Sequence, residues 1–171
     1  MLTLFAALLL AQSAPAAKPA APAASPAPAT NFYATPIGMG IGVDHAKKVA
    51  AAAAAEAHKN GWFMAVAVVD PAGTLVYYEK ADNTQMASAE VAILKARSAA
   101  LYKRPTKVFQ DGLAKGAENL RILQLKGAVA VEGGIPLVMD GKLVGAIGVS
   151  GDQSSNDNQC ATAGAAALTS K

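Results

Sequence analysis

Two histidines are the side chains in this sequence best suited to hold a metal centre. His45 and His58 stand thirteen residues apart in one expected helix, which places them about 20 Å apart along its axis. They therefore cannot share one metal ion within a chain, although either imidazole could ligate an iron atom alone. For His58, at the helix end, a solvated imidazole that suits the helix dipole is the favoured interpretation, whereas His45, in the first turn, is more open to ligation.

Lys95 is the member of a basic segment that falls on an apolar helix face. At helical spacing it lies between Val91 and Ser98, where an unpaired ammonium group would be costly. Two interpretations stand about even: its aliphatic stem carries the charge out to solvent, or the charge meets an anionic group of a ligand, such as a carboxylate. In the second interpretation the neighbouring Arg97 would help to hold the anion.

Two carboxylates, Glu79 and Asp82, follow an expected strand and stand three residues apart. Oxygen ligands of this kind can hold a hard or ferric ion, so the pair is a candidate metal site, although isolated pairs usually face solvent. The sequence has no nucleophile elbow, phosphate-binding loop or metalloprotease helix. It therefore predicts no conventional catalytic constellation, and whether the protein is an enzyme stays open.

The single cysteine, Cys160, excludes an internal disulfide and any site built from several cysteines of one chain. We expect it to be a small buried apolar residue rather than a reactive thiol. The net charge of +3 is modest, and the basic residues are mostly interspersed with acidic ones. A nucleic-acid partner is therefore not expected.

The start of the chain resembles an export signal followed by a tether. An apolar run from Leu2 to Ala11 is too short to span a bilayer as a helix, and the small residues after it resemble a signal-peptidase site. We interpret residues 1–13 as a signal peptide, 14–36 as a flexible linker rich in Ala and Pro, and 37–171 as one domain. The mature protein is then expected in the periplasm or the medium, without a membrane anchor.

The domain alternates helix signals with hairpin signals. Asp44 can cap an Ala-rich helix that ends before Gly61, and a second helix from Ser88 to Tyr102 is broken by Arg104-Pro105. Further elements are expected as a hairpin at 63–69 and 74–78, a short helix from Thr106, a short strand at 128–131, strands at 135–139 and 143–149, and a last helix at 154–168. This order predicts an α+β two-layer sandwich in which helices pack on a mainly antiparallel sheet of about five strands.

The last hairpin contains an unusual number of glycines. Asp140-Gly141 supplies the two positive-φ positions of a type I′ turn. Glycines in and beside its strands suggest places where another backbone or a flat ligand comes close to the sheet, at positions 133, 134, 145, 148 and 151. We therefore expect a ligand site where this hairpin meets the helix that carries Lys95.

Several of these motifs together make the chain resemble the GlcG/HbpS family of haem-binding proteins, in its secreted or periplasmic branch. The motifs follow the family's order at Val68–Gly73, Lys95–Ala99, Arg104–Thr106, Gly133–Leu137, Asp140–Gly151 and Asp157–Ala161. The resemblance implies a profilin-like or sensor-like fold, homo-oligomers up to octamers, and haem binding in at least some members. It also implies roles for some relatives in haem degradation or redox sensing, and for others a link to glycolate or diol use.

The resemblance leads to a candidate haem site and two competing functions. The site residues would be His45, Lys95, Arg97, Thr106, Gly133 and Gly134, with iron ligation by His45, Thr106 or another group left open. A family acidic pair for iron would fall on Glu79 and Asp82. The first hypothesis is an exported haem-binding protein, and the second an enzyme or accessory protein, related to glycolate or diol use, that binds a small organic acid without haem. An oligomeric scaffold without a ligand is a third alternative.

Overall fold

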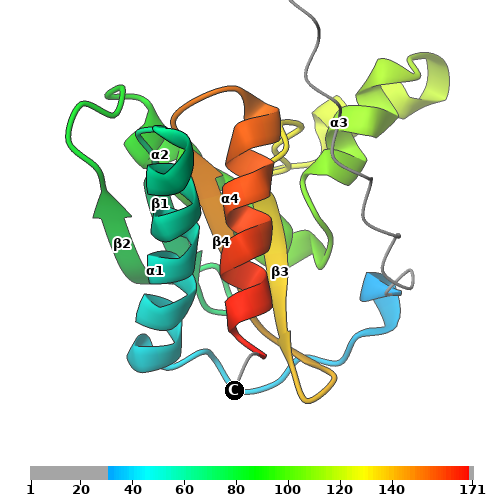
Figure 1. Ribbon diagram of the computed structural model, residues 1–171. Coiled ribbons are helices and arrows are strands. Elements are labelled where there is room, and N and C mark those ends of the chain that lie inside the picture. The colour runs from blue at the N-terminus through cyan, green and yellow to red at the C-terminus, as the bar shows by residue number, and fades with distance from the viewer. Residues whose placement is uncertain (1–30, 170–171) are drawn as a thin grey trace, which may run out of the picture. The chain divides into compact units, whose positions relative to one another are not determined.

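The structure is a computed structural model that describes residues 31–169 (Figure 1). The expected signal peptide and most of the expected linker lie outside the described residues. The described residues belong to one compact unit. Within it the Pro36 carbonyl accepts a hydrogen bond from Leu143 N, and Gly38 N donates to Leu143 O, both at 2.8 Å. None of the described helices is long and apolar enough to cross a bilayer.

A four-stranded antiparallel sheet forms the centre of the fold, with the strand order β2-β1-β4-β3. Its strands are β1 (Ala65–Val69), β2 (Leu75–Lys80), β3 (Gly134–Met139) and β4 (Lys142–Ser150). β1 and β4 are buried because helices cover both of their faces. The tight turn between β3 and β4 has φ angles of 51° at Asp140 and 73° at Gly141, which confirms the expected type of hairpin turn.

The helices lie on both faces of the sheet (Figure 1). On one face are α1 (Val43–Asn60) and α4 (Ser154–Ala167), and on the other is α2 (Ser88–Tyr102). α1 presents small side chains to the sheet and to α4, as its Ala-rich stripe predicts, and these are buried at Ala46, Val49, Ala50, Ala53 and Ala57. These small side chains allow α1 to pack closely on α4 and on the sheet. The buried apolar side chains of the fold form two separate clusters.

Local sequence signals explain where the helices end. α1 ends where Gly61 adopts a left-handed conformation with φ 74°, and its N-cap is Gly42, so Asp44 lies in the first turn and is not the cap. α2 has the expected bounds, and α3 (Lys107–Ala114) follows Thr106. After it comes the 3-10 helix η2 (Ala117–Gln124). The short strand expected at 128–131 is absent, because Val129 N donates to the Ser98 hydroxyl at 3.0 Å and not to a neighbouring strand.

Candidate functional site

Lys95 is closed off inside the fold. Its side chain is 1% exposed, and its Nζ lies 2.7 Å from Asp157 Oδ2 and 3.1 Å from the Val149 carbonyl oxygen. The expected choice between a solvated ammonium and a ligand contact is therefore corrected: the charge is neutralised by a buried carboxylate from α4. Desolvation raises the pKa of Asp157, although Lys95 and the backbone N–H groups of Asp152 and Gly151 act in the opposite direction.

Two glycines of the last hairpin, Gly134 and Gly148, are explained by the approach of a helix backbone. A Cβ atom on Gly148 would meet Ala92 O and lie 2.5 Å from Ala96 N, and one on Gly134 would meet Lys95 O. α2 thus occupies the space in which a flat ligand was expected. This corrects the interpretation of the hairpin as the wall of an open slot, since the close approach that glycine permits is made by the chain itself.

The remaining candidates do not gather into one site. Thr106 is fully buried, its backbone N donates to Gly134 O, and its hydroxyl accepts from Gly134 N, both at 2.9 Å. Arg97 is exposed and donates from Nε to the Gly73 carbonyl at 3.0 Å. His45 is exposed in the first turn of α1. Thr106 and Gly134 thus join Lys95 and Gly133 in a buried junction, while Arg97 and His45 lie elsewhere.

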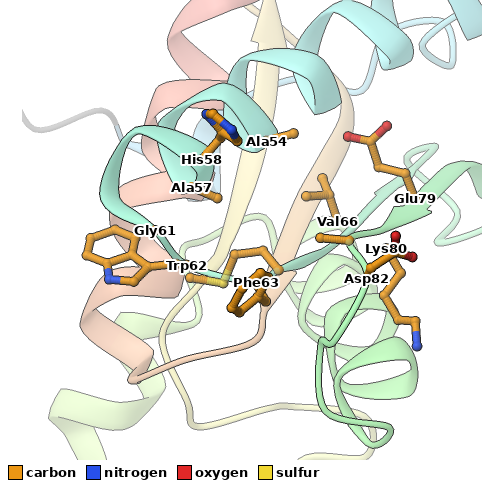
Figure 2. A pocket seen from close by; sticks show the side chains of 12 residues that line it. Ala54, Ala57, His58, Gly61, Trp62, Phe63, Val66, Glu79, Lys80 and Asp82 are labelled. Carbon is orange, nitrogen blue, oxygen red and sulfur yellow. The ribbon is translucent and has the colours of Figure 1, made fainter.

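A cavity of about 530 Å³ opens where the C-terminal end of α1 meets the end of β2. Its lining is mostly apolar and includes two aromatic residues, one histidine and two acids, in full Ala54, Ala57, His58, Gly61, Trp62, Phe63, Met64, Val66, Glu79, Lys80, Ala81 and Asp82. Figure 2 shows Trp62 and Phe63 on one side of this pocket and Glu79 and Asp82 on the other. The expected acidic pair therefore belongs to a cavity, together with the histidine for which a solvated role was favoured.

The order of elements in the sequence contains a signal for this cavity. In an antiparallel hairpin the residues before the first strand lie beside those after the second, and here Ala65 pairs with Lys80. Trp62 and Phe63 follow the stop of α1 at Gly61, so the hairpin brings them next to residues 79–82. His58, one turn before that stop, then falls at the same end of the sheet.

The acidic side of the cavity is partly anchored. Glu79 Oε2 accepts a hydrogen bond of 3.0 Å from the Tyr77 hydroxyl, and this bond, more than charge or burial, raises the pKa of Tyr77. Within residues 31–169, no group of three or more His, Cys, Asp or Glu side chains is arranged to hold a metal ion. Glu79 and Asp82 would thus need ligands from outside the described protein groups to complete an iron site.

Cys160 has the buried character expected of it. Its side chain is fully buried, and desolvation raises the pKa of its thiol to about 12. At pH 8 only about one molecule in 10⁴ would carry the reactive thiolate. We expect an aromatic disulfide reagent at pH 8 to leave the native protein unlabelled and to label it fully in concentrated guanidinium chloride. Rapid labelling of the native protein would contradict this placement.

Comparisons with known proteins identify the family. The chain is 37% identical to the protein GlcG of Escherichia coli K12 over 105 residues, which is 61% of this chain and 77% of GlcG. The crystal structure of HbpS matches with a TM-score of 0.71 and 32% identity, covering 78% of this chain and 93% of HbpS. A crystal structure of a PduOC–haem complex matches with a TM-score of 0.69 and 26% identity, covering 77% of this chain and 96% of the PduOC chain. Residues 41–166 match the family model described as haem degrading protein HbpS-like, and the chain belongs to this family.

Proposed function

We propose that this chain binds haem in the cavity between the end of α1 and the end of β2. The observation that carries the proposal is an imidazole, His58, on the lining of a largely apolar cavity of about 530 Å³ that also contains Trp62 and Phe63. Haem is a flat, mostly apolar group, and imidazole is a common ligand of its iron. The solved PduOC–haem complex among the relatives supports the same cofactor.

The residues of the cavity suit separate parts of a haem group. His58 would hold the iron, the aromatic rings would contact the macrocycle, and Lys80 is the cation available to a propionate. The negative charges of Glu79 and Asp82, on either side of Lys80 in the sequence, would oppose its attraction for a propionate. When bound, haem would supply redox and oxygen chemistry, and the protein's own part is to bind and orient it.

The proposal includes export of the mature protein and its assembly into a homo-oligomer. Export is supported by the sequence of residues 1–13, and self-association by exposed apolar side chains such as Met39, Met86 and Leu123. Iron binding by Glu79 and Asp82 and a part in redox sensing also stay predictions. Cell fractionation would test export, and the native mass of the mature chain would test assembly into a homo-oligomer.

Replacing His58 by alanine should weaken hemin binding. Loss of an iron ligand should raise the Kd at least about tenfold and shift the Soret band, since removing even a hydrogen-bond partner of a metal ligand typically costs 10- to 100-fold. The measurement is a titration of purified mature protein with hemin, followed by absorbance.

The matched control for this experiment is His45→Ala, which removes the other histidine of the same helix. It is expected to leave the Kd within about twofold, because both histidines are exposed but only His58 is part of the cavity lining. Equal weakening by both variants, or an unchanged spectrum in His58→Ala, would remove His58 from the site. The absence of saturable binding in the unaltered protein would overturn the proposed function.

A further inference from the structure

A second cavity, of about 500 Å³, lies among residues of the N-terminal segment, α3 and η2. It differs from the first because cations dominate its charged lining. The lining residues are Tyr33, Arg104, Val108, Phe109, Asp111, Gly112, Lys115, Asn119, Arg121, Ile122 and Leu125. We refer to it as the basic cavity.

Arg104 carries a positive charge with no carboxylate oxygen within 4 Å of its guanidinium group among residues 31–169. Its Nε donates to the Tyr102 carbonyl at 3.0 Å, and its Nη1 donates to the Tyr33 hydroxyl at 2.7 Å. The guanidinium carbon lies 4.1 Å from the centroid of the Tyr33 ring and 5.3 Å from that of Phe109. These neutral contacts fix the half-buried side chain and leave its charge unbalanced among the described residues.

Two further cations and one acid complete the charge of the basic cavity. Lys115 and Arg121 are exposed and make no ion pair within residues 31–169. Asp111, the one acid of the lining, already accepts a hydrogen bond of 2.9 Å from Lys107. Three positive groups against one engaged carboxylate make the cavity attractive to an anion.

The rest of the lining selects an anion with an apolar body. The rings of Tyr33 and Phe109 and the side chains of Val108, Ile122 and Leu125 line the same space. Close packing at Gly112, where a Cβ atom would lie 2.6 Å from Ile122 Cδ1, holds α3 against η2. A concave, partly apolar cavity of this size is typical of a site for a small molecule. A macromolecular partner would instead contact a flatter surface.

We propose that the basic cavity binds an organic carboxylate with an aromatic or similarly flat apolar body. The carboxylate would contact Arg104, whose fork geometry suits it, with Lys115 and Arg121 adding attraction at the rim. The apolar body of the ligand would contact the side chains of Phe109 and its apolar neighbours in the lining. This lining shares no residue with the cavity of the proposed haem site, so the site is separate from it and does not depend on it.

The test uses phenylacetate as the probe and phenylacetamide as its uncharged analogue, titrated calorimetrically into the mature protein. Phenylacetate should bind saturably, at least about tenfold more tightly than phenylacetamide, and more weakly at higher ionic strength. Equal affinity for the two probes, or no saturable binding of phenylacetate, overturns the proposal.

A double variant, Lys115→Gln/Arg121→Gln, locates the site. It should raise the Kd of phenylacetate about tenfold, while the charge-matched Lys47→Gln/Lys142→Gln should stay within about twofold, because its lysines are exposed and lie outside this lining. Circular dichroism of both variants is the check that they are folded. An unchanged Kd in the first double variant overturns the proposal, and competition between phenylacetate and hemin overturns the separation of the two sites.

Discussion

Replacing Lys95 by methionine should lower the free energy of unfolding by about 3–5 kcal/mol, because it leaves a carboxylate buried without its partner. The two side chains are 1% and 3% exposed, and Asp157 Oδ2 has no other cation within 4 Å among the described residues. The value is measured by urea denaturation of the mature protein, with the slope of the transition compared between variants.

The pH dependence of this variant separates the buried charge from a simple packing defect. Burial raises the pKa of Asp157 above its ordinary value of 3.8, so protonation of this carboxyl favours the folded state. The stability that it contributes is complete below pH 3.8 and is lost as the pH rises through the folded pKa. Without Lys95 the pKa of Asp157 rises further. The loss of unfolding free energy in Lys95→Met, relative to the unaltered protein, should therefore be smaller at pH 4 than at pH 8.

A double variant, Lys95→Met/Asp157→Asn, is the control for this prediction. It removes both charges and keeps a side-chain oxygen that can accept from the Asp152 N–H, so it should recover most of the lost stability. A deficit in Lys95→Met below about 1 kcal/mol, or one that does not change with pH, would show that the pair is not buried and coupled as described.

Replacing Gly148 by alanine should cost about 3 kcal/mol of stability through overpacking. The new methyl group would meet Ala92 O and lie 2.5 Å from Ala96 N and 3.0 Å from Ala96 Cβ. Two of these three atoms belong to the backbone of α2, so the clash is relieved only if the helix moves away from β4. Thermal unfolding of the variant measures the loss.

The matched control is Gly40→Ala. A methyl group at Gly40 makes ordinary contacts, 3.4 Å from Asp70 Cβ and 3.7 Å from Pro71 Cδ, and the residue is exposed. Its effect should stay within about 0.5 kcal/mol. If the two substitutions cost the same, α2 does not pack on Gly148 as closely as described.

The sequence predicted those elements whose signals are local. Gly61 ends α1, Pro105 prevents α2 from continuing, and Asp140-Gly141 forms the turn, because each acts on its own backbone angles. The strand expected at 128–131 failed for a non-local reason. Its composition suits a strand, but its backbone is hydrogen-bonded to the hydroxyl of Ser98, which lies 31 residues earlier.

The candidate site was harder to predict because the role of each side chain depends on residues that are distant in the sequence. The apolar surroundings of Lys95 showed that its charge needed a partner, yet Asp157 lies 62 residues away in sequence. The glycines showed that something approaches the last hairpin, but only the position of α2 decides between a helix and a ligand. His58 lies in a cavity because the pairing of β1 with β2 brings residues 79–82 to the end of α1. The sequence pattern of α1 alone does not indicate this pairing.

The contact between Lys95 and Asp157 also joins the two helical layers. Lys95 belongs to α2 and Asp157 to α4, which cover opposite faces of the sheet. If either helix detached alone, it would leave an ammonium or a carboxylate stranded in the interior. Partial opening is therefore disfavoured, and the slowest amide protons of α2 and α4 should exchange with solvent through one shared, global event.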